Sequence, residues 1–257
     1  RAAQMLNLTQ PAVSQHIRYL EEQYDTPLFI REKKKLYLTD AGQILKDSLE
    51  TLQSDDHRMK IRMQQSMAGK KGLTFGVTMT IGEYAVIPSL ARFLKAHPQW
   101  EIHICYGNTQ TLLSRLREGT LDFAIVEGYF REDLYTTRIL QKEPFIGVAS
   151  SKHIFQKPVS CLRDLTGERL LLREHGSGTR AILTKILALN NLSAEDFSHI
   201  IEIENIHAIV SLLREDCGIS FLYQSAVKKE LEDKTLIEIP LSDFKIAHDF
   251  LFIWNKD

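Results

Sequence analysis

Apolar residues near the start of the chain recur with the spacing of two short helices. A first helix over residues 2–6 is interrupted at residues 7–9, and a second helix begins at once. Thr9 is a suitable N-cap for this second helix, and Pro11 is tolerated because the N–H groups of a first turn have no partner inside the helix. The apolar stripe consists of Val13, Ile17 and Leu20. Two short helices joined by a tight turn predict a helix-turn-helix.

The opposite face of the second helix is polar. Its side chains are short or planar groups of the kind that hydrogen-bond to base edges and to phosphates. We therefore expect this helix to contact DNA. The predicted contacts are Thr9, Gln10, Pro11, Ser14, Gln15 and Arg18.

Two apolar segments, residues 26–30 and 36–39, lie on either side of a basic stretch, which predicts a β-hairpin. The stretch between them, residues 31–35, holds four cations and one anion. Such cations would lie on the phosphate backbone, where they add salt-dependent affinity without sequence information. The alternative is an ordinary solvated turn, but the neighbouring helix-turn-helix favours a DNA-binding wing. The predicted contacts of the wing are Arg31, Lys33 and Lys34.

A long helix is predicted from residue 40 to about residue 68, with Asp40 and Gln43 forming a pair like that of a capping box. Its apolar residues alternate in steps of four and three, and Asp56 occupies one polar position of that seam. The apolar positions are Leu45, Leu49, Leu52, Met59 and Met63. This heptad pattern indicates a dimerisation helix. The alternative is an amphipathic helix that packs on its own domain.

Beyond a glycine-containing boundary at residues 69–72, strands and helices alternate. We predict strands over residues 73–78, 101–106 and 121–126, and helices over residues 83–95 and 110–117. This alternation favours a mostly parallel sheet with both faces covered. In such sheets, ligands bind beyond the carboxyl ends of the strands.

A second series of strands and helices begins near residue 169. Its strands are predicted over residues 169–172, 200–203 and 218–222, and the last strands, 236–240 and 250–254, return to the first lobe. Two α/β lobes whose strand ends face each other would enclose a cleft. Residues 175–179 open a helix whose free N–H groups and dipole favour an anion, although a plain helix cap is the alternative.

Composition narrows the picture further. The chain has 257 residues and a formal net charge of -1, so any DNA contact must come from a local basic patch. No segment approaches the roughly 20 apolar residues of a membrane helix, and the first residues lack the apolar core of a signal peptide. We therefore expect a cytoplasmic protein that has no membrane partner. The three cysteines have no CxxC spacing and are expected to be reduced and buried, with a redox-active pair as the alternative.

The first forty residues closely resemble the DNA-binding domain of LysR-type transcriptional regulators. The matching residues are 1–3, 6–17, 20–21, 27–29, 31 and 38–42. The family has a further helix before this point, so the resemblance implies that the sequence begins inside this domain. Asp25 departs from the family, which often has glycine there, but aspartate tolerates the left-handed conformation of a helix end.

The resemblance implies an α/β protein with three parts. These are a winged helix-turn-helix over residues 1–40, a linker and dimerisation helix over residues 41–69, and a two-lobed effector-binding domain over residues 70–257. The third part would have the fold of a type 2 periplasmic binding protein. Its first lobe would comprise about residues 72–148 and 243–257, and its second lobe about residues 149–242.

The same resemblance places Thr78 and Thr80 in the family's primary effector loop, with helix capping as the alternative role of these hydroxyls. Other polar strand ends and the opening of the helix near residue 178 complete the expected site. The predicted effector contacts are Thr78, Thr80, Ile81, Asn108, Thr109, Glu127, Ser177, Gly178, Thr179 and Asn205.

The function implied is that of a DNA-binding regulator whose activity changes when a small polar or anionic metabolite binds between the lobes. Its partners would be double-stranded DNA, the effector, and further copies of itself in a homodimer and a homotetramer, and it would have no cofactor. The alternative is a solute-binding or catalytic α/β protein whose helical appendage does not contact DNA.

Motifs of enzymes are not evident in the sequence. Ser177 lacks the flanking glycines of a nucleophile elbow, because His175 and Thr179 occupy those positions. The sequence contains no dinucleotide or P-loop fingerprint. His153, His199 and His207 do not have metal-ligand spacing, so we expect neither a metal site nor an enzyme activity.

Overall fold

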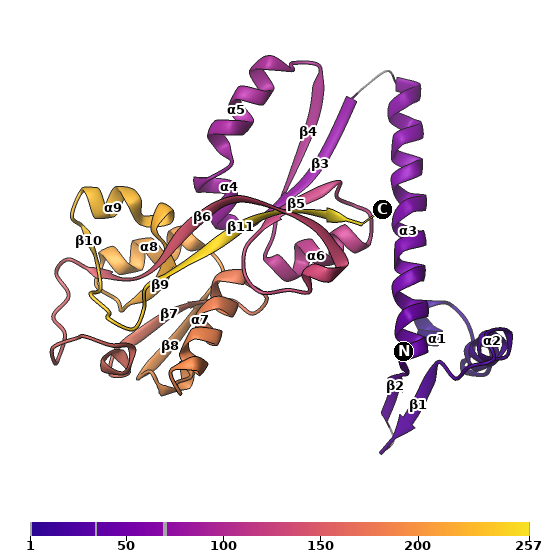
Figure 1. Cartoon of the computed structure of the whole chain (residues 1–257), viewed down its shortest axis with the longest axis horizontal. Coiled ribbons are helices and arrows are strands. Elements are labelled where there is room, and N and C mark those ends of the chain that lie inside the picture. The colour runs from indigo at the N-terminus through magenta and orange to yellow at the C-terminus, as the bar shows by residue number, and fades with distance from the viewer. Residues whose placement is uncertain (1, 34, 69–70, 257) are drawn as a thin grey trace. The chain divides into compact units, whose positions relative to one another are not determined.

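The computed structural model describes residues 2–33, 35–68 and 71–256 (Figure 1). Lys34, a predicted DNA contact, lies outside the described residues. The chain divides into two compact units, residues 1–56 and 57–257, which we describe separately. The domain boundaries predicted above, at residues 40 and 69, stay a prediction.

The first unit begins with the two predicted helices, α1 (Ala2–Met5) and α2 (Gln10–Gln23). The Thr9 hydroxyl accepts a hydrogen bond from the Ala12 N–H at 3.3 Å, so the predicted N-cap is confirmed. Asp25 follows α2 with a φ of 46°, which is the left-handed conformation expected at that position. Capping at both ends therefore fixes α2 between two turns.

The predicted hairpin is also present. Strand β1 (Phe29–Glu32) pairs antiparallel with β2 (Lys35–Leu38), so Arg31 and Lys35 lie within strands and the tip is shorter than predicted. The Glu21 carboxylate accepts hydrogen bonds from the N–H groups of Leu28 (2.8 Å) and Phe29 (3.3 Å). These bonds hold the start of the hairpin against α2.

The predicted long helix is α3 (Asp40–Ala68), and the division between the two units falls within it. Most of the predicted heptad positions are exposed in the single chain. The side chains of Leu49, Leu52, Met59 and Met63 are 51%, 63%, 53% and 60% exposed. The helix therefore presents an apolar row that its own unit leaves uncovered.

The second unit is built on a seven-stranded sheet in the order β10-β6-β11-β5-β3-β4, with β9 also paired to β6. Strands β3 (Lys71–Val77), β4 (Trp100–Tyr106) and β5 (Phe123–Val126) are parallel, as predicted. The remaining pairs are antiparallel, so the prediction of a mostly parallel sheet is wrong. The antiparallel strands are β6 (Tyr135–Ser150), β9 (Ser220–Tyr223), β10 (Leu236–Glu238) and β11 (Ile246–Asn255).

The strand β6 accounts for this error, because the sequence did not reveal it. It pairs with β11 along residues 135–145 and with β9 and β10 near its end, without a break at the lobe boundary predicted after residue 148. Strands β6 and β11 therefore form the continuous structure that joins the two lobes (Figure 1). The predicted return to the first lobe is confirmed for residues 250–254 by the pairing of β11 with β5. The other strand that was predicted to return, β10, instead pairs with residues 148–150 at the end of β6.

The helix predicted over residues 83–95 is two helices, α4 (Met79–Tyr84) and α5 (Ile87–Ala96). Pro88 explains the difference. In the interior of a continuous helix it would remove a backbone hydrogen bond, whereas in the first turn of α5 the N–H that it lacks would have no partner within the helix. Helix α6 (Thr109–Arg117) follows β4 and begins at the Asn108 cap.

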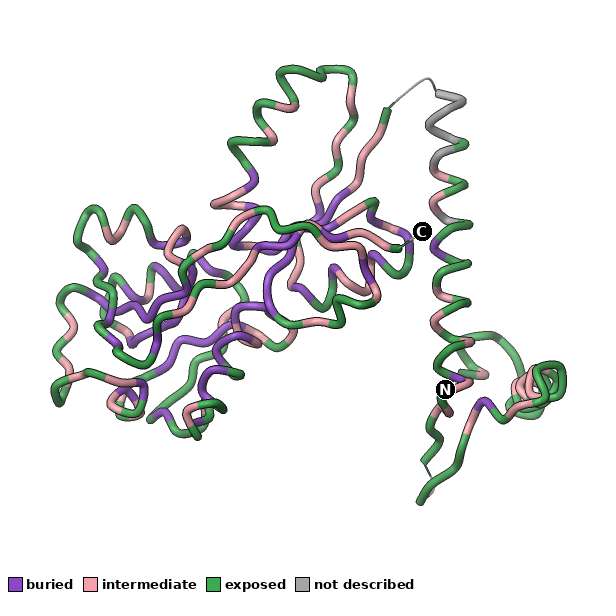
Figure 2. The backbone as a smooth tube through the Cα atoms, in the orientation of Figure 1, coloured by how far each residue is buried: buried purple, intermediate pink, exposed green. Residues whose placement is uncertain are grey.

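The second lobe adds a two-stranded parallel sheet, β7 (Arg169–Arg173) with β8 (His199–Ile203). Its helices are α7 (Gly178–Leu189), α8 (Ile206–Arg214) and α9 (Lys228–Glu232), and its short 3-10 turns are Leu162–Leu165, Ala194–Asp196 and Gln224–Val227. A further 3-10 turn, Glu132–Leu134, precedes β6. The largest buried cluster includes Val77 from one lobe and Leu170 from the other. Figure 2 shows buried segments in both lobes. The lobes therefore share a hydrophobic core.

Gly42 offers a test of the first unit. A methyl group at Gly42 would lie 2.1 Å from the Leu28 carbonyl oxygen and 2.9 Å from a Leu38 methyl carbon. Gly42→Ala should therefore destabilise residues 1–56 by about 1–3 kcal/mol, the usual cost of overpacking, and hydrogen exchange in these residues should accelerate. Gly167→Ala is the control, because its methyl group meets nothing within 4 Å. Equal exchange rates in both variants would contradict this packing.

Candidate functional site

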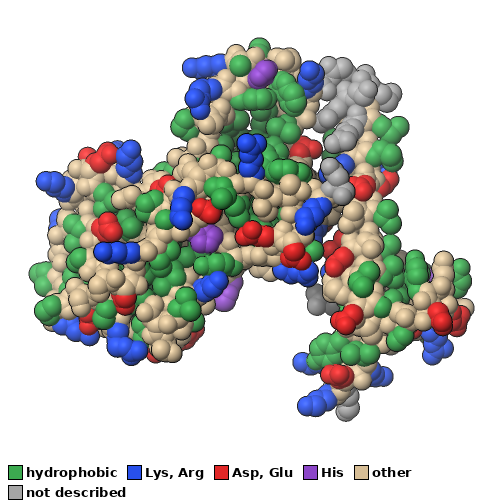
Figure 3. Space-filling model, in the orientation of Figure 1, with side chains coloured by type: hydrophobic (Ala, Val, Ile, Leu, Met, Phe, Trp, Pro, Cys, Tyr) green, Lys and Arg blue, Asp and Glu red, His purple; other side chains and the backbone are tan. Residues whose placement is uncertain are grey.

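The polar face of α2 is open to solvent. Gln10, Ser14, Gln15 and Arg18 are accessible, as are Thr9 and Pro11, whereas the apolar stripe on the other face is partly buried. Arg31 and Lys33 are exposed on the hairpin, and Figure 3 shows cationic side chains gathered where that hairpin lies. The described residues that were predicted to contact DNA are thus accessible to a partner.

Three of the predicted effector residues make hydrogen bonds to a fourth, Glu127, which directly follows β5 and has a buried carboxylate. The Thr78 hydroxyl, at the end of β3, donates to one carboxylate oxygen. The Thr179 hydroxyl, on α7 of the other lobe, donates to the second oxygen at 3.5 Å. The Thr109 hydroxyl donates to the Glu127 carbonyl oxygen at 2.8 Å. Hydroxyl groups from both lobes therefore meet at one acidic residue.

The two lobes touch through their backbones at the same point. A methyl group at Gly178 would lie 2.1 Å from the Glu127 carbonyl oxygen and 2.8 Å from the Thr109 hydroxyl. Gly128 has a φ of 98°, and a methyl group there would lie 2.5 Å from the Gly178 Cα atom. Only glycine fits at these two positions, so the close contact is built into the sequence.

Burial controls the ionisation of Glu127. Desolvation raises the pKa of this carboxyl group to about 7, although the hydrogen bond from Thr78 and the charge of Arg173 act in the opposite direction. Arg173 is itself buried, and its guanidinium group binds the Glu174 carboxylate through two bonds of 2.8 and 3.1 Å. The charge of Glu127 therefore lacks a dedicated ion pair among the described residues.

Two other predicted hydroxyls are buried without a hydrogen-bond partner among the described residues, namely those of Thr80 and Ser177. Thr78 and Ser177 occupy the N-cap positions of α4 and α7, yet neither side chain makes a capping bond. Helix capping therefore does not account for these side chains. Buried hydroxyl groups usually have partners, so this region holds unused hydrogen-bonding capacity.

A cavity of about 540 Å³, which we call the cleft cavity, lies between the lobes. Asn108 and Asn205 line it, and each caps a helix by accepting from a backbone N–H, that of Thr111 (2.9 Å) or of Ala208 (3.0 Å). Arg173 and His175 add potential cationic groups to its wall, and three carboxylates also line it, those of Glu174, Glu202 and Glu204.

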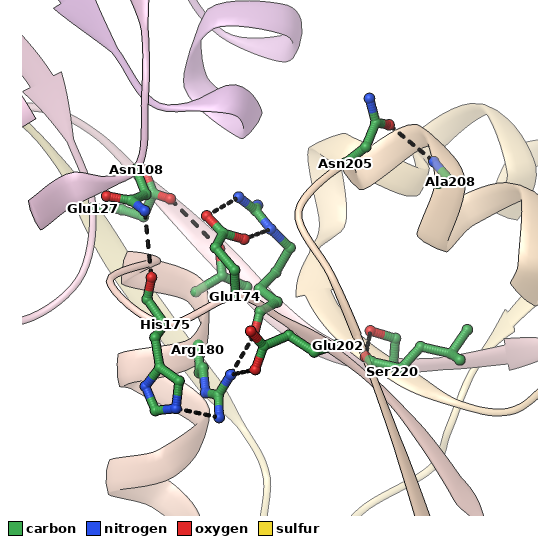
Figure 4. A network of polar contacts seen from close by, with 12 residues as sticks. Asn108, Glu127, Glu174, His175, Arg180, Glu202, Asn205, Ala208 and Ser220 are labelled. Carbon is green, nitrogen blue, oxygen red and sulfur yellow. Dashed lines mark hydrogen bonds and ion pairs between the residues drawn. The ribbon is translucent and has the colours of Figure 1, made fainter. Parts of the chain in front are cut away.

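A polar network crosses the cleft cavity (Figure 4). Arg180 forms an ion pair with Glu202, donates to the Arg173 carbonyl oxygen at 3.0 Å, and lies 3.1 Å from the Nε2 atom of His175. Asn108 donates to the His175 carbonyl oxygen at 3.4 Å and so connects the first lobe to this network. The hydrogen bond from Arg180 lowers the pKa of Glu202.

The ten predicted effector residues do not line a single cavity. Asn108 and Asn205 line the cleft cavity, whereas Thr109, Ser177 and Gly178 line a second one. Ile81 is fully buried within the hydrophobic core. Sequence reasoning missed Arg173, Arg180 and Glu202. Arg173 and Glu202 lie at the ends of β7 and β8, and Arg180 lies in the first turn of α7. The rule that ligands bind at strand ends could have identified them.

Other chemistry is less evident. Cys105, Cys161 and Cys217 are free thiols. The prediction that all three are buried is wrong for Cys161 and Cys217, which are half-buried because they lie in connecting segments, at the start of a 3-10 turn and after α8. Among the described residues, the histidine, cysteine and acidic side chains do not form a group of three that would hold a metal ion. In the same part of the chain, every helix is too short or too polar to cross a membrane.

The raised pKa of Glu127 predicts a specific dependence of stability on pH. Because the folded state favours the neutral carboxyl group, the free energy of unfolding is highest below the ordinary pKa of 4.5 and falls as the pH rises to about 7. Glu127→Gln should remove this fall, which amounts to about 3 kcal/mol at most. Urea unfolding at pH 5, 6, 7 and 8 measures it. Glu204→Gln, in the cleft wall, is the control, and equal pH profiles for the wild type and Glu127→Gln would contradict the burial argument.

Two family models match the chain. The model described as a bacterial regulatory helix-turn-helix protein of the lysR family matches residues 1–43, and the LysR substrate binding domain matches residues 69–257. The HTH-type transcriptional activator CmpR of Synechocystis is 30% identical over 259 residues, which cover 100% of this chain and 84% of CmpR. The HTH-type transcriptional regulator CysL of Bacillus subtilis is 27% identical over 255 residues, 98% of this chain and 84% of CysL.

Solved structures share the fold. The regulatory domain of Synechocystis CcmR in complex with 2-PG has a TM-score of 0.64 at 21% identity and covers 72% of this chain and 88% of its own. A full-length OxyR variant from Pseudomonas aeruginosa has a TM-score of 0.59 at 23% identity, and the match covers 99% of this chain and 83% of the OxyR chain. The matches span the helix-turn-helix, the linker helix and both lobes. The chain therefore belongs to the LysR family and is a DNA-binding transcription regulator with an effector-binding domain.

Proposed function

We propose that α2 is the recognition helix and that its exposed polar face contacts base edges in the major groove of double-stranded DNA. The accessibility of Ser14, Gln15 and Arg18 on the face opposite the core supports this assignment. The hairpin of β1 and β2 would place Arg31 and Lys33 on the phosphate backbone. Residues 1–40 would thus act as the DNA-binding domain.

The protein acts as a homodimer in this proposal, with α3 as the pairing element. The exposed row formed by Leu49, Leu52, Met59 and Met63 supports it, because burying that row against a second copy removes apolar surface from water. A dimer would also bring two recognition helices to matching half-sites. The further assembly into a homotetramer rests on the family resemblance alone.

The effector in this proposal is a small polar or anionic metabolite that binds in the cleft cavity. The observation that supports this most directly is the convergence of Asn108, Asn205 and Arg173 from both lobes on one cavity of about 540 Å³. The buried contact around Glu127 would respond to the ligand through Arg173, which lines the cleft cavity and whose charge acts on the Glu127 carboxyl group. A ligand that prefers one arrangement of the lobes shifts the population toward it.

The chain in this proposal senses its ligand without transforming it and works in the cytoplasm. The cleft wall contains carboxylates, amides and cations, but a nucleophile activated by an adjacent base is not evident among the described lining residues. The regulatory relatives CmpR and CysL support the same conclusion.

DNA binding provides the first test. Gln15→Ala and Ser14→Ala should each weaken binding to the operator by about 1–3 kcal/mol, while binding to unrelated DNA stays the same. Lys33→Ala should weaken both equally and reduce the slope of affinity against salt by about one. A mobility-shift titration at several salt concentrations measures these effects. Gln23→Ala, exposed in the last turn of α2, is the matched control, and operator affinity unchanged by Gln15→Ala and Ser14→Ala would refute the recognition helix.

Effector binding provides the second test. A thermal-shift screen of small organic acids, amino-acid derivatives and phosphates should reveal compounds that stabilise the wild type. Asn205→Asp keeps the cap of α8, since aspartate is an equally good N-cap, but it adds a negative charge to the cleft cavity. The shift caused by an anionic compound should therefore shrink, and the shift caused by a neutral one should not. Equal shifts for anions in both proteins would place the effector elsewhere.

A further inference from the structure

A second and larger cavity lies beside α7. Its volume is about 800 Å³, and it is bounded by one side of α7, by α6, by Tyr129 and by residues 192–195. Among the described residues, His175 is the one lining residue that it shares with the cleft cavity. We call it the α7 cavity. Its size lies within the range of small-molecule sites, roughly 300–1,000 Å³.

Much of its wall is apolar. Leu113 projects from α6, Ala181 and Ala188 lie along α7, and Leu192 and Ala194 follow that helix. Small side chains at 181 and 188 leave room for a ligand body against α7. Such a wall favours an apolar group, because contact with it removes apolar surface from water.

One cation in this wall has no ion pair among the described residues. The Lys185 ammonium lies 3.8 Å from the centre of the Tyr129 ring. The carboxylate of Glu195 also lines the cavity, but it does not form a salt bridge with Lys185. The positive charge is therefore held in place by an aromatic face and remains available to an anion.

A second polar region lies where α7 begins. Ser177 lines the cavity, and its hydroxyl is buried with no hydrogen-bond partner among the described residues. The first N–H groups of this twelve-residue helix have no partners within it, and Arg180 and His175 lie beside them. The α7 cavity therefore has two places that favour a negative charge, Lys185 and the beginning of α7, on either side of its apolar wall.

We propose that the α7 cavity is a second ligand site, distinct from the cleft cavity, and that it takes an amphiphilic organic anion. The apolar body would lie against Ala181 and Leu192. The carboxylate would bind Lys185 or the beginning of α7. Arg180 lines this cavity and also pairs with Glu202 in the cleft wall. A ligand bound in one cavity would therefore change the ligand affinity of the other.

Phenylacetate is a suitable probe, with its neutral counterpart phenylacetamide and inorganic phosphate as comparisons. Calorimetric titration of the full chain should show that phenylacetate binds and that the other two bind at least about fivefold more weakly. Lys185→Gln should reduce phenylacetate affinity about fivefold, the effect of losing one partly exposed charge interaction. Ala181→Trp should abolish binding by filling the cavity.

Two control variants make the result decisive. Lys229→Gln removes an exposed lysine on α9 and should leave phenylacetate affinity unchanged. Thr111→Trp narrows the cleft cavity instead and should change phenylacetate affinity less than Lys185→Gln does. Circular dichroism verifies that each variant is folded. Three outcomes would overturn the proposal: no binding to the wild type, binding unaffected by Lys185→Gln and Ala181→Trp, or equal loss in Thr111→Trp. Phosphate binding as tight as that of phenylacetate would refute the amphiphilic class.

Discussion

The second unit depends on the contact that the two lobes make around Glu127. The carboxylate is buried, and hydroxyl groups from the ends of β3 and α7 donate to its two oxygens. Gly178 brings the backbones together so closely that a single methyl group would not fit. Strands β6 and β11 connect the lobes covalently, and a shared hydrophobic core packs between them. The polar contact at Glu127 adds to this core a point where the backbones of the two lobes meet directly.

A buried carboxylate without a dedicated cation is a costly arrangement for a purely structural contact. Its nearest cationic influence, Arg173, binds Glu174 and at the same time lines the cleft cavity. A ligand that alters the electrostatic environment of Arg173 would alter the balance between the neutral and ionised forms of Glu127. The lobe contact is thus sensitive to charge in the cleft, whereas an apolar contact of the same shape would not be.

Sequence periodicity was sufficient where structure is local. The cap at Thr9, the turn at Asp25 and the span of α3 depend on residues a few positions apart, and each was predicted. Strand β6 was missed because its partner β11 lies about a hundred residues away and much of its length is polar and half exposed. The rule that ligands bind at strand ends located Asn108, Glu127 and Asn205, but the division into two cavities depends on how α6 and α7 pack.

The two units differ sharply in how they bury apolar surface. In the second unit, large clusters of buried residues extend through both lobes, whereas Leu28 is the one buried hydrophobic residue among the described part of the first. In the homodimer proposed above, the exposed apolar row of α3 would supply the surface for pairing. Such pairing would stabilise the predicted DNA-binding residues and also set their spacing, and the linker helix would then connect assembly to DNA recognition.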